Sequence, residues 1–170
     1  MAEVGLLAPD TRVELIEGEI IDMAPIGTDH ASVVNRLTRL LIMAIGDRGI
    51  VQIQGPARLD RYSEPEPDVA VFAPREDFYR HVRPSLAQTL LVIEVSDSTL
   101  RYDLDVKLPL YARHGIAEVW TVDLQNNELR CYRSPDSGRY LAESIARQPG
   151  MTALSTLPGV AVDLSGIFEG

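Results

Sequence analysis

The sequence contains only one cysteine, Cys131, and only one lysine, Lys107, among its 170 residues. A single cysteine excludes an intramolecular disulfide, and the residues around it match no metal or redox motif. Long apolar runs are missing too: the longest in a predicted helix, LLIMAI at residues 40–45, is far too short to span a bilayer. The first residues also lack the basic and apolar regions of a signal peptide. These absences predict a cytoplasmic protein without a membrane partner.

Positive charge is scarce as well. The chain has 25 acidic and 16 basic residues, which gives a net charge of −9. This excess of acid argues against a broad surface that binds polyanions non-specifically. It still allows a local basic patch, or a site at which metal ions supply the positive charge. The length and the ordinary share of hydrophobic residues, 45%, predict one globular domain over residues 1–170.

Lys107 stands out because every other basic residue, His aside, is an arginine. Two interpretations remain open. The arginine bias reflects genome composition and the lysine is chance, or position 107 requires an amine. Arginine stays protonated and fork-shaped, whereas lysine is a compact charge whose pKa shifts readily. An amine at this position can point at one oxygen or give up a proton near a reaction centre.

Hydrophobic periodicity predicts an α/β domain with a mixed central sheet. Alternation on both sides of Glu17-Gly18 predicts a β-hairpin over residues 12–25. Thr28 or Asp29 is expected to cap a helix over residues 30–47. Further strands are predicted over residues 50–60, 68–72, 89–96, 117–124 and 128–134, a second helix over residues 102–114, and short strands within residues 140–168.

Glu94 interrupts the most hydrophobic predicted strand, TLLVIEVS at residues 89–96. An unpaired carboxylate inside a protein is costly, so this one should be paired, solvated or bound to a metal. The structural interpretation is an ion pair with arginine or a cap on the backbone. The functional interpretation is a ligand for a hard cation such as Mg²⁺, which prefers oxygen and few protein carboxylates.

Asp68 repeats this pattern at the start of the predicted strand 68–72. If the two strands are neighbours, Asp68 and Glu94 meet at one edge of the sheet, with Lys107 on the helix that follows. Such a set suits hydrolysis. The acids would hold a metal that lowers the pKa of water, and the amine would position that water and stabilise negative charge.

Three segments carry a resemblance to a known family: PEPDVAVF at residues 65–72, LLVIEVSDST at 90–99 and DLDVKLPLYARHGIAEVWTVDL at 103–124. In this order they resemble the PD-(D/E)XK nuclease superfamily. They look most like its Uma-type branch of bacterial proteins assigned as endonucleases. The segments VELIEGEIIDMAP at residues 13–25 and TLPGVAVDLSGIF at 156–168 match that branch as well. The resemblance implies the restriction-endonuclease-like fold, a mixed central sheet flanked by helices with an N-terminal hairpin.

The resemblance also implies roles for individual residues. Asp68 would be a metal ligand, Glu94 the second acid, and the backbone carbonyl of Val95 a further ligand. In the simplest form of the superfamily a lysine stands two positions after the second acid, where this chain has Ser96. In the Uma-type branch a lysine on the next helix takes over, and Lys107 stands at that place.

Further matches are less defined. Glu19 matches an N-terminal acid that assists the metal or the water, although Glu14 and Glu17 compete for this role and a solvated hairpin carboxylate is the alternative. His30 either caps the helix end or contacts phosphate. Ser96 either contacts substrate or caps the backbone at the end of its strand.

The function implied by the resemblance is Mg²⁺-dependent hydrolysis of phosphodiester bonds in nucleic acid, expected to be DNA, with Mn²⁺ able to substitute. A homodimer is expected because duplex cleavage needs two sites. The alternative is an inactive module of the same fold that binds a protein or a DNA complex. Asp97 favours this alternative, because the branch has proline there and the extra acid weakens phosphate approach. Pro109 predicts that the helix of Lys107 either begins late or bends.

Overall fold

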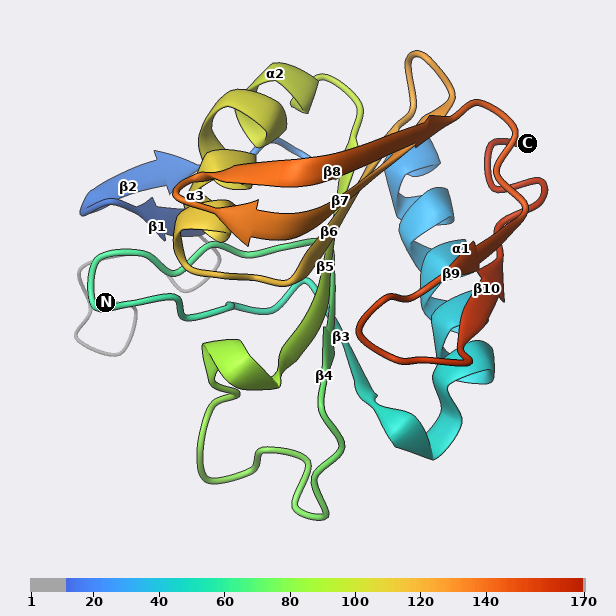
Figure 1. Cartoon of the computed structure of the whole chain (residues 1–170). Helices are drawn as coiled ribbons and strands as arrows, with labels where there is room; N and C mark the ends of the chain where they lie inside the picture. The colour runs from blue at the N-terminus through green and yellow to red at the C-terminus, as the bar shows by residue number, and fades with distance from the viewer. Residues whose placement is uncertain (1–11, 170) are drawn as a thin grey trace.

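A central sheet of six strands runs through the molecule (Figure 1). The structure is a computed structural model, and it describes residues 12–169. In spatial order the strands are β3 Ile50–Ile53, β4 Val69–Phe72, β5 Thr89–Ser96, β6 Glu118–Asp123, β7 Glu128–Asp136 and β8 Arg139–Ala146. β5 and β6 pair in parallel, whereas all other neighbours pair antiparallel. The sheet is therefore mixed, which confirms the predicted fold class.

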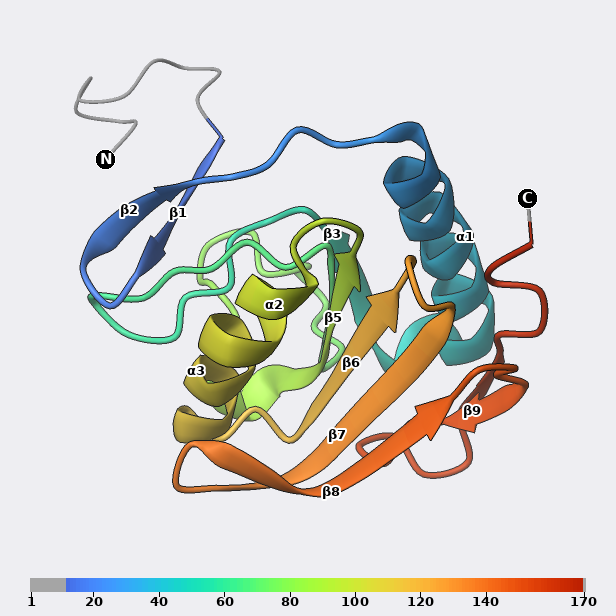
Figure 2. The ribbon, with the colours of Figure 1, turned by 90° about the horizontal axis from the view of Figure 1, so that it is seen from above.

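Helices cover both faces of this sheet (Figure 2). One face packs against α1, Thr28–Ile45. The other packs against a composite segment of α2 Leu100–Tyr102, the π-helical turn η4 Asp103–Lys107 and α3 Leu108–Arg113. Two 3₁₀ helices, η2 Gly46–Arg48 and η3 Leu86–Gln88, lie in connections. Each face has its own hydrophobic core, so the central strands β4, β5 and β6 are buried between two layers.

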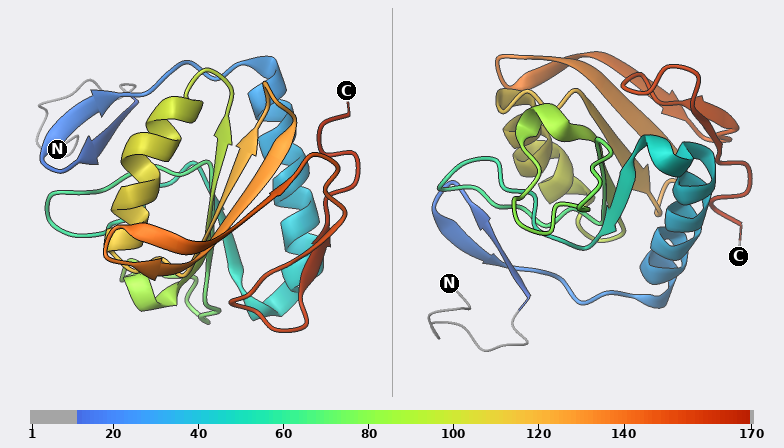
Figure 3. Two further views of the ribbon diagram at one scale, coloured as in Figure 1. Left: turned by 45° about the horizontal axis from the view of Figure 1, so that its top comes forward. Right: turned by 90° about the horizontal axis from the view of Figure 1, so that it is seen from below.

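Two smaller strand pairs flank the layers (Figure 3). β1 Val13–Ile16 and β2 Glu19–Asp22 form the predicted N-terminal hairpin, beside the α2–α3 segment. β9 Met151–Ala153 and β10 Ala161–Asp163 pair near α1. The C-terminal segment that contains them adds apolar side chains to the core under α1, namely Leu154, Leu157, Val160, Val162, Leu164 and Ile167. The N-terminal hairpin therefore lies against one layer, and the C-terminal strand pair lies against the other.

β5 is buried on both faces, as its nearly continuous apolar sequence predicts. Its side chains alternate, so Leu91, Ile93 and Val95 enter the core beneath α1. Val92 faces the opposite core, beneath α3. Glu94 shares that second face and is only 4% exposed. The alternation of the strand therefore directs one carboxylate at the α2–α3 segment.

The second helical segment departs from the single helix predicted over residues 102–114. It begins at Leu100 and contains a π turn, in which the N–H of Leu108 donates to the carbonyl of Asp103. Pro109 follows this turn at the beginning of α3, where a proline is tolerated because it need not donate a hydrogen bond. The helical segment therefore does not begin late, and a π turn, a local departure from the regular helix, directly precedes the proline.

Three boundaries also differ from the prediction. β3 stops at Ile53 instead of continuing to residue 60, because Gln54 has a φ of 45° and Gly55-Pro56 follows. The N-cap of α1 is Gly27, without a side-chain cap from Thr28 or Asp29. The region after residue 138 contains the eight-residue strand β8 in addition to short strands. Within residues 12–169, no helix is both long and apolar enough to cross a lipid bilayer.

Candidate active site

A cavity of about 440 Å³ opens at the C-terminal end of β5. The β1–β2 hairpin, the start of α1, the β5–α2 connection and η4 surround it. Seven carboxylate side chains line the cavity: Glu14, Asp22, Glu66, Asp68, Glu94, Asp97 and Asp103. The basic side chains of the described lining are Arg12, His30 and Lys107. The cavity is therefore acidic, and a polyanion could enter it only if a cation compensated this charge.

Asp68 lies immediately before β4, next to the end of β5. Val69 pairs with Ile93 in the antiparallel register, which places Asp68 and Glu94 at the same end of the sheet. Asp68 Oδ2 accepts a hydrogen bond of 2.8 Å from the N–H of Val95. The two acids predicted to act together therefore come from adjacent strands and line one cavity.

His30 contacts Asp68 rather than capping its helix. Its Nε2 lies 3.1 Å from Asp68 Oδ1. The hydrogen bond to Asp68 raises the pKa of His30, although burial acts in the opposite direction. His30 therefore orients one oxygen of Asp68 while the backbone of Val95 holds the other.

Glu94 is held by two donors at the same oxygen. Its Oε1 lies 2.7 Å from Lys107 Nζ and accepts a hydrogen bond of 2.6 Å from the Tyr111 hydroxyl. Burial raises the pKa of Glu94 to about 8, despite the nearby ammonium group. Ionised Glu94 is thus costly in this environment, which a bound cation would relieve.

Lys107 is almost fully buried between two acids. Besides Glu94, its Nζ contacts Glu14 Oε2 at 3.3 Å. Burial by itself would lower the pKa of Lys107, but the surrounding carboxylates raise it overall. The only lysine of the chain is therefore a charged group that lines the cavity beside Glu14 and Glu94.

The N-terminal hairpin supplies Glu14 to this cluster, not Glu19. Glu14 is buried, and its Oε2 also accepts the N–H of Glu66 at 3.2 Å. Glu19 is exposed on β2 and does not line the cavity. Glu17 is exposed in the turn and pairs with Arg113 at 2.9 Å. Strand alternation explains the difference, because Glu14 lies on the inward-facing side of β1.

The site contains two further residues that the sequence motifs do not mark, Asp103 and Tyr111. Asp103 Oδ2 accepts hydrogen bonds from Ser96 Oγ at 2.7 Å and Thr99 Oγ1 at 2.8 Å. Burial raises the pKa of Asp103. Ser96 is fully buried, and its hydroxyl donates this hydrogen bond to Asp103. A signal for both residues was present, because Asp103, Lys107 and Tyr111 are spaced four apart.

The cavity offers the type of ligand that Mg²⁺ prefers, carboxylate oxygen. Asp68 and Glu94 offer carboxylate oxygens at one cavity, and Mg²⁺ commonly takes one or two carboxylates and keeps several waters. Among the described residues, no three or more histidine, cysteine or acidic side chains are arranged to hold a metal ion. Two carboxylates at an open cavity fit a hard cation that keeps several water ligands.

Comparison with known proteins identifies the family of the chain. The profile of the Uma2 family, described as "Putative restriction endonuclease", matches residues 2–165. The chain belongs to the Uma2 family. This confirms the resemblance stated from the motifs, and the family is one of nucleases by its description.

A solved structure shares the fold of this Uma2 chain. It is the crystal structure of "a putative nuclease belonging to DUF820" from Anabaena variabilis, which superposes with a TM-score of 0.74 at 16% sequence identity. The match covers 98% of this chain and 94% of the other. None of the curated proteins matches the chain. At this identity the similarity supports the fold, and the chemistry rests on the residues of the cavity.

Proposed function

We propose that this Uma2 protein hydrolyses phosphodiester bonds of nucleic acid, with DNA as the substrate, in a reaction that depends on Mg²⁺. The observation that carries the proposal is the convergence of Asp68, Glu94 and Lys107. Asp68 directly precedes β4, Glu94 lies in β5 and Lys107 in η4, and all three line one cavity. Two carboxylates and an amine at one open site form the set expected for metal-assisted hydrolysis. The family description supports the same reaction class.

Each residue has a role that follows from its contacts. Mg²⁺ held by Asp68 and Glu94, with the Val95 carbonyl as a further ligand, would supply positive charge and acidify water. His30 and the N–H of Val95 orient Asp68. Lys107, released from Glu94, would align the attacking water and stabilise negative charge on the phosphate.

Glu14 takes the place predicted for Glu19. It contacts Lys107 at 3.3 Å and stands at the cavity, so it can keep the ammonium group nearby when Glu94 turns to a cation. Hydrolysis of both strands of a duplex would require two such sites, and we therefore propose a homodimer as the acting form.

A second candidate function is a binding module that does not cleave. The observation that favours it is the acidic cavity, in which Lys107 is already neutralised by two carboxylates. A site in this state repels phosphate unless a cation binds. Metal binding therefore separates the two functions.

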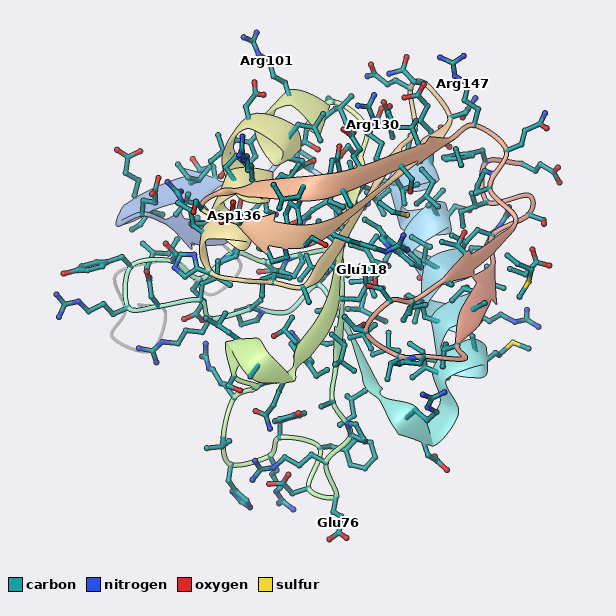
Figure 4. All side chains as sticks on the ribbon, in the orientation of Figure 1. Glu76, Arg101, Glu118, Arg130, Asp136 and Arg147 are labelled. Carbon is teal, nitrogen blue, oxygen red and sulfur yellow. The ribbon has the colours of Figure 1, made fainter. Side chains whose placement is uncertain are left out.

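The test combines calorimetry with a cleavage assay. We expect the wild type to bind Mn²⁺ or Mg²⁺ and to cleave DNA only with metal present. Asp68→Ala should lose both properties, whereas Lys107→Ala should lose cleavage. Glu76→Gln is a control, because Glu76 lies in the β4–β5 connection, far from Arg101 of α2 (Figure 4), and does not line the cavity. Cleavage by both Asp68→Ala and Lys107→Ala would overturn the proposal, and a wild type that binds no metal would favour the binding module.

A further inference from the structure

The π turn η4 aligns three functional side chains on one face of the second helical segment. Asp103, Lys107 and Tyr111 follow each other at intervals of four residues, and they are 6%, 3% and 0% exposed. In a regular α-helix two such intervals would rotate by about 80° around the axis. A π turn holds more residues than an α turn, so the interval inside η4 counteracts this drift. All three side chains can therefore face the end of β5.

Each of the three makes its own contact with the end of β5. Asp103 accepts from Ser96, Lys107 contacts Glu94, and Tyr111 donates to Glu94. On the opposite side of the same segment, Arg101 and Asp105 are exposed and pair with each other at 3.4 Å. The inward row thus has a common target, the strand that carries the second acid.

The two donors to Glu94 arrive at one atom, Oε1. No hydrogen bond of the described residues involves the other oxygen, Oε2, and Glu94 lines the cavity. A buried carboxylate oxygen that loses a hydrogen-bond donor becomes costly. If Lys107 were its only donor, the movement of Lys107 toward a substrate would leave Oε1 unpaired.

We infer that Tyr111 is a positioning residue that holds Oε1 of Glu94, so that Oε2 stays available to a cation and Lys107 can leave. This inference rests on the proposed metal-dependent hydrolysis. The Tyr111 hydroxyl is neutral. It can therefore donate a hydrogen bond to Glu94 without neutralising the negative charge that would attract a metal ion. Its ring is fixed in the core under α3, so the hydroxyl has a defined position.

The test is calorimetric titration of Mn²⁺ into wild type and variants at 25 °C. Tyr111→Phe should weaken Mn²⁺ binding by about tenfold, because one hydrogen bond to a charged group is lost. Tyr140→Phe is the matched control. It also removes a hydroxyl that donates inside the protein, to the carbonyl of Ile116 at 2.7 Å, but outside the cavity. Its Mn²⁺ affinity should equal that of the wild type.

A second variant keeps the inference falsifiable if Tyr111→Phe does not fold. Lys107→Met leaves Tyr111 as the sole donor to Glu94, and its Mn²⁺ affinity should not fall below that of the wild type. Unchanged binding by Tyr111→Phe, or lost binding by a folded Lys107→Met, would overturn the role of Tyr111 and leave the proposed function intact. A wild type without any Mn²⁺ binding would overturn both.

Discussion

Two buried glutamates on the adjacent parallel strands β5 and β6 have opposite surroundings. Glu118, fully buried, accepts from Trp120 Nε1 at 2.9 Å and Arg133 Nε at 2.9 Å with Oε1. Its Oε2 accepts both the N–H and the hydroxyl of Ser155 at 2.7 Å. Glu94, by contrast, has both of its donors on one oxygen and borders a cavity. Burial alone therefore does not distinguish the two carboxylates.

The difference lies in what each carboxylate can still accept. Glu118 connects the sheet to the C-terminal segment, and Figure 4 places it between them. Its oxygens are saturated by groups that are fixed in the fold, so it has no capacity for a ligand. Glu94, in contrast, accepts no hydrogen bond at Oε2 from residues 12–169, and its side chain lines the cavity. A buried carboxylate in this fold thus stabilises the structure when both of its oxygens have hydrogen-bond donors. It can bind a ligand when one oxygen has none.

The largest effect is expected from Glu94→Gln on catalysis. The amide cannot neutralise a cation, so metal-dependent cleavage should fall by about 10³-fold or more. Stability should stay within about 1 kcal/mol of the wild type, because burial already disfavours the charge of Glu94 and the amide removes that cost. Cleavage rates and urea unfolding at pH 7.5 measure the two quantities. A large loss of stability would mean that Glu94 resembles Glu118.

Glu118→Gln should give the reverse result. Removing the charge leaves Arg133 without its carboxylate and disturbs the bonds to Ser155, which should cost about 3 kcal/mol of unfolding free energy. The urea midpoint should drop without a change in the slope of the transition. The folded protein should bind Mn²⁺ as tightly as the wild type. Weaker Mn²⁺ binding by folded Glu118→Gln would show that the bonds of Glu118 also support the metal site at Glu94.

The sequence predicted those parts of the fold that follow from local periodicity. β5 has the predicted limits, because residues 89–96 are apolar on both faces. The apolar stripe of α1 predicts the helix, but the predicted cap by Thr28 or Asp29 is wrong, because the N-cap residue is Gly27, which has no side chain to recognise. The sequence predicts only short strands where the structure has the eight-residue strand β8. The alternation of β8 is weak because it is an exposed edge strand. Edge strands are defined by their neighbour more than by their own residues.

In the candidate site, the order of the motifs predicted Asp68, Glu94 and Lys107, and the structure brings them to one cavity. Glu14 could not be chosen over Glu19 from alternation alone, because the pairing of the hairpin with the rest of the chain determines which face turns inward. Tyr111 packs its ring into the core, and nothing in the sequence marks its hydroxyl as a donor to Glu94. The contact with Glu94 depends on the π turn, and helical periodicity does not predict such a turn.

Cys131 provides the prediction with the smallest expected effect. It lies on β7, next to β6, the strand that carries Glu118. It pairs with Trp120 across β6 and β7 and belongs to the core covered by the C-terminal segment. Burial raises the pKa of its thiol from 9.0 to about 12, so the thiolate that reacts with iodoacetamide is scarce in the folded protein at pH 8. Since the unfolded chain releases this proton at lower pH, stability should also fall as pH rises from about 9 toward 12.

Alkylation of Cys131 should therefore be slow in the wild type and equally slow in Glu94→Gln. In Glu118→Gln it should be about tenfold faster, because the C-terminal segment is held less firmly and opens locally more often. Mass spectrometry of the alkylated fraction over time measures this rate. Acceleration in Glu94→Gln would show that the candidate site and the Glu118 cluster share one opening event. Equal rates in all three proteins would show instead that the core around Cys131 stays closed when the bonds from Glu118 to Ser155 are lost.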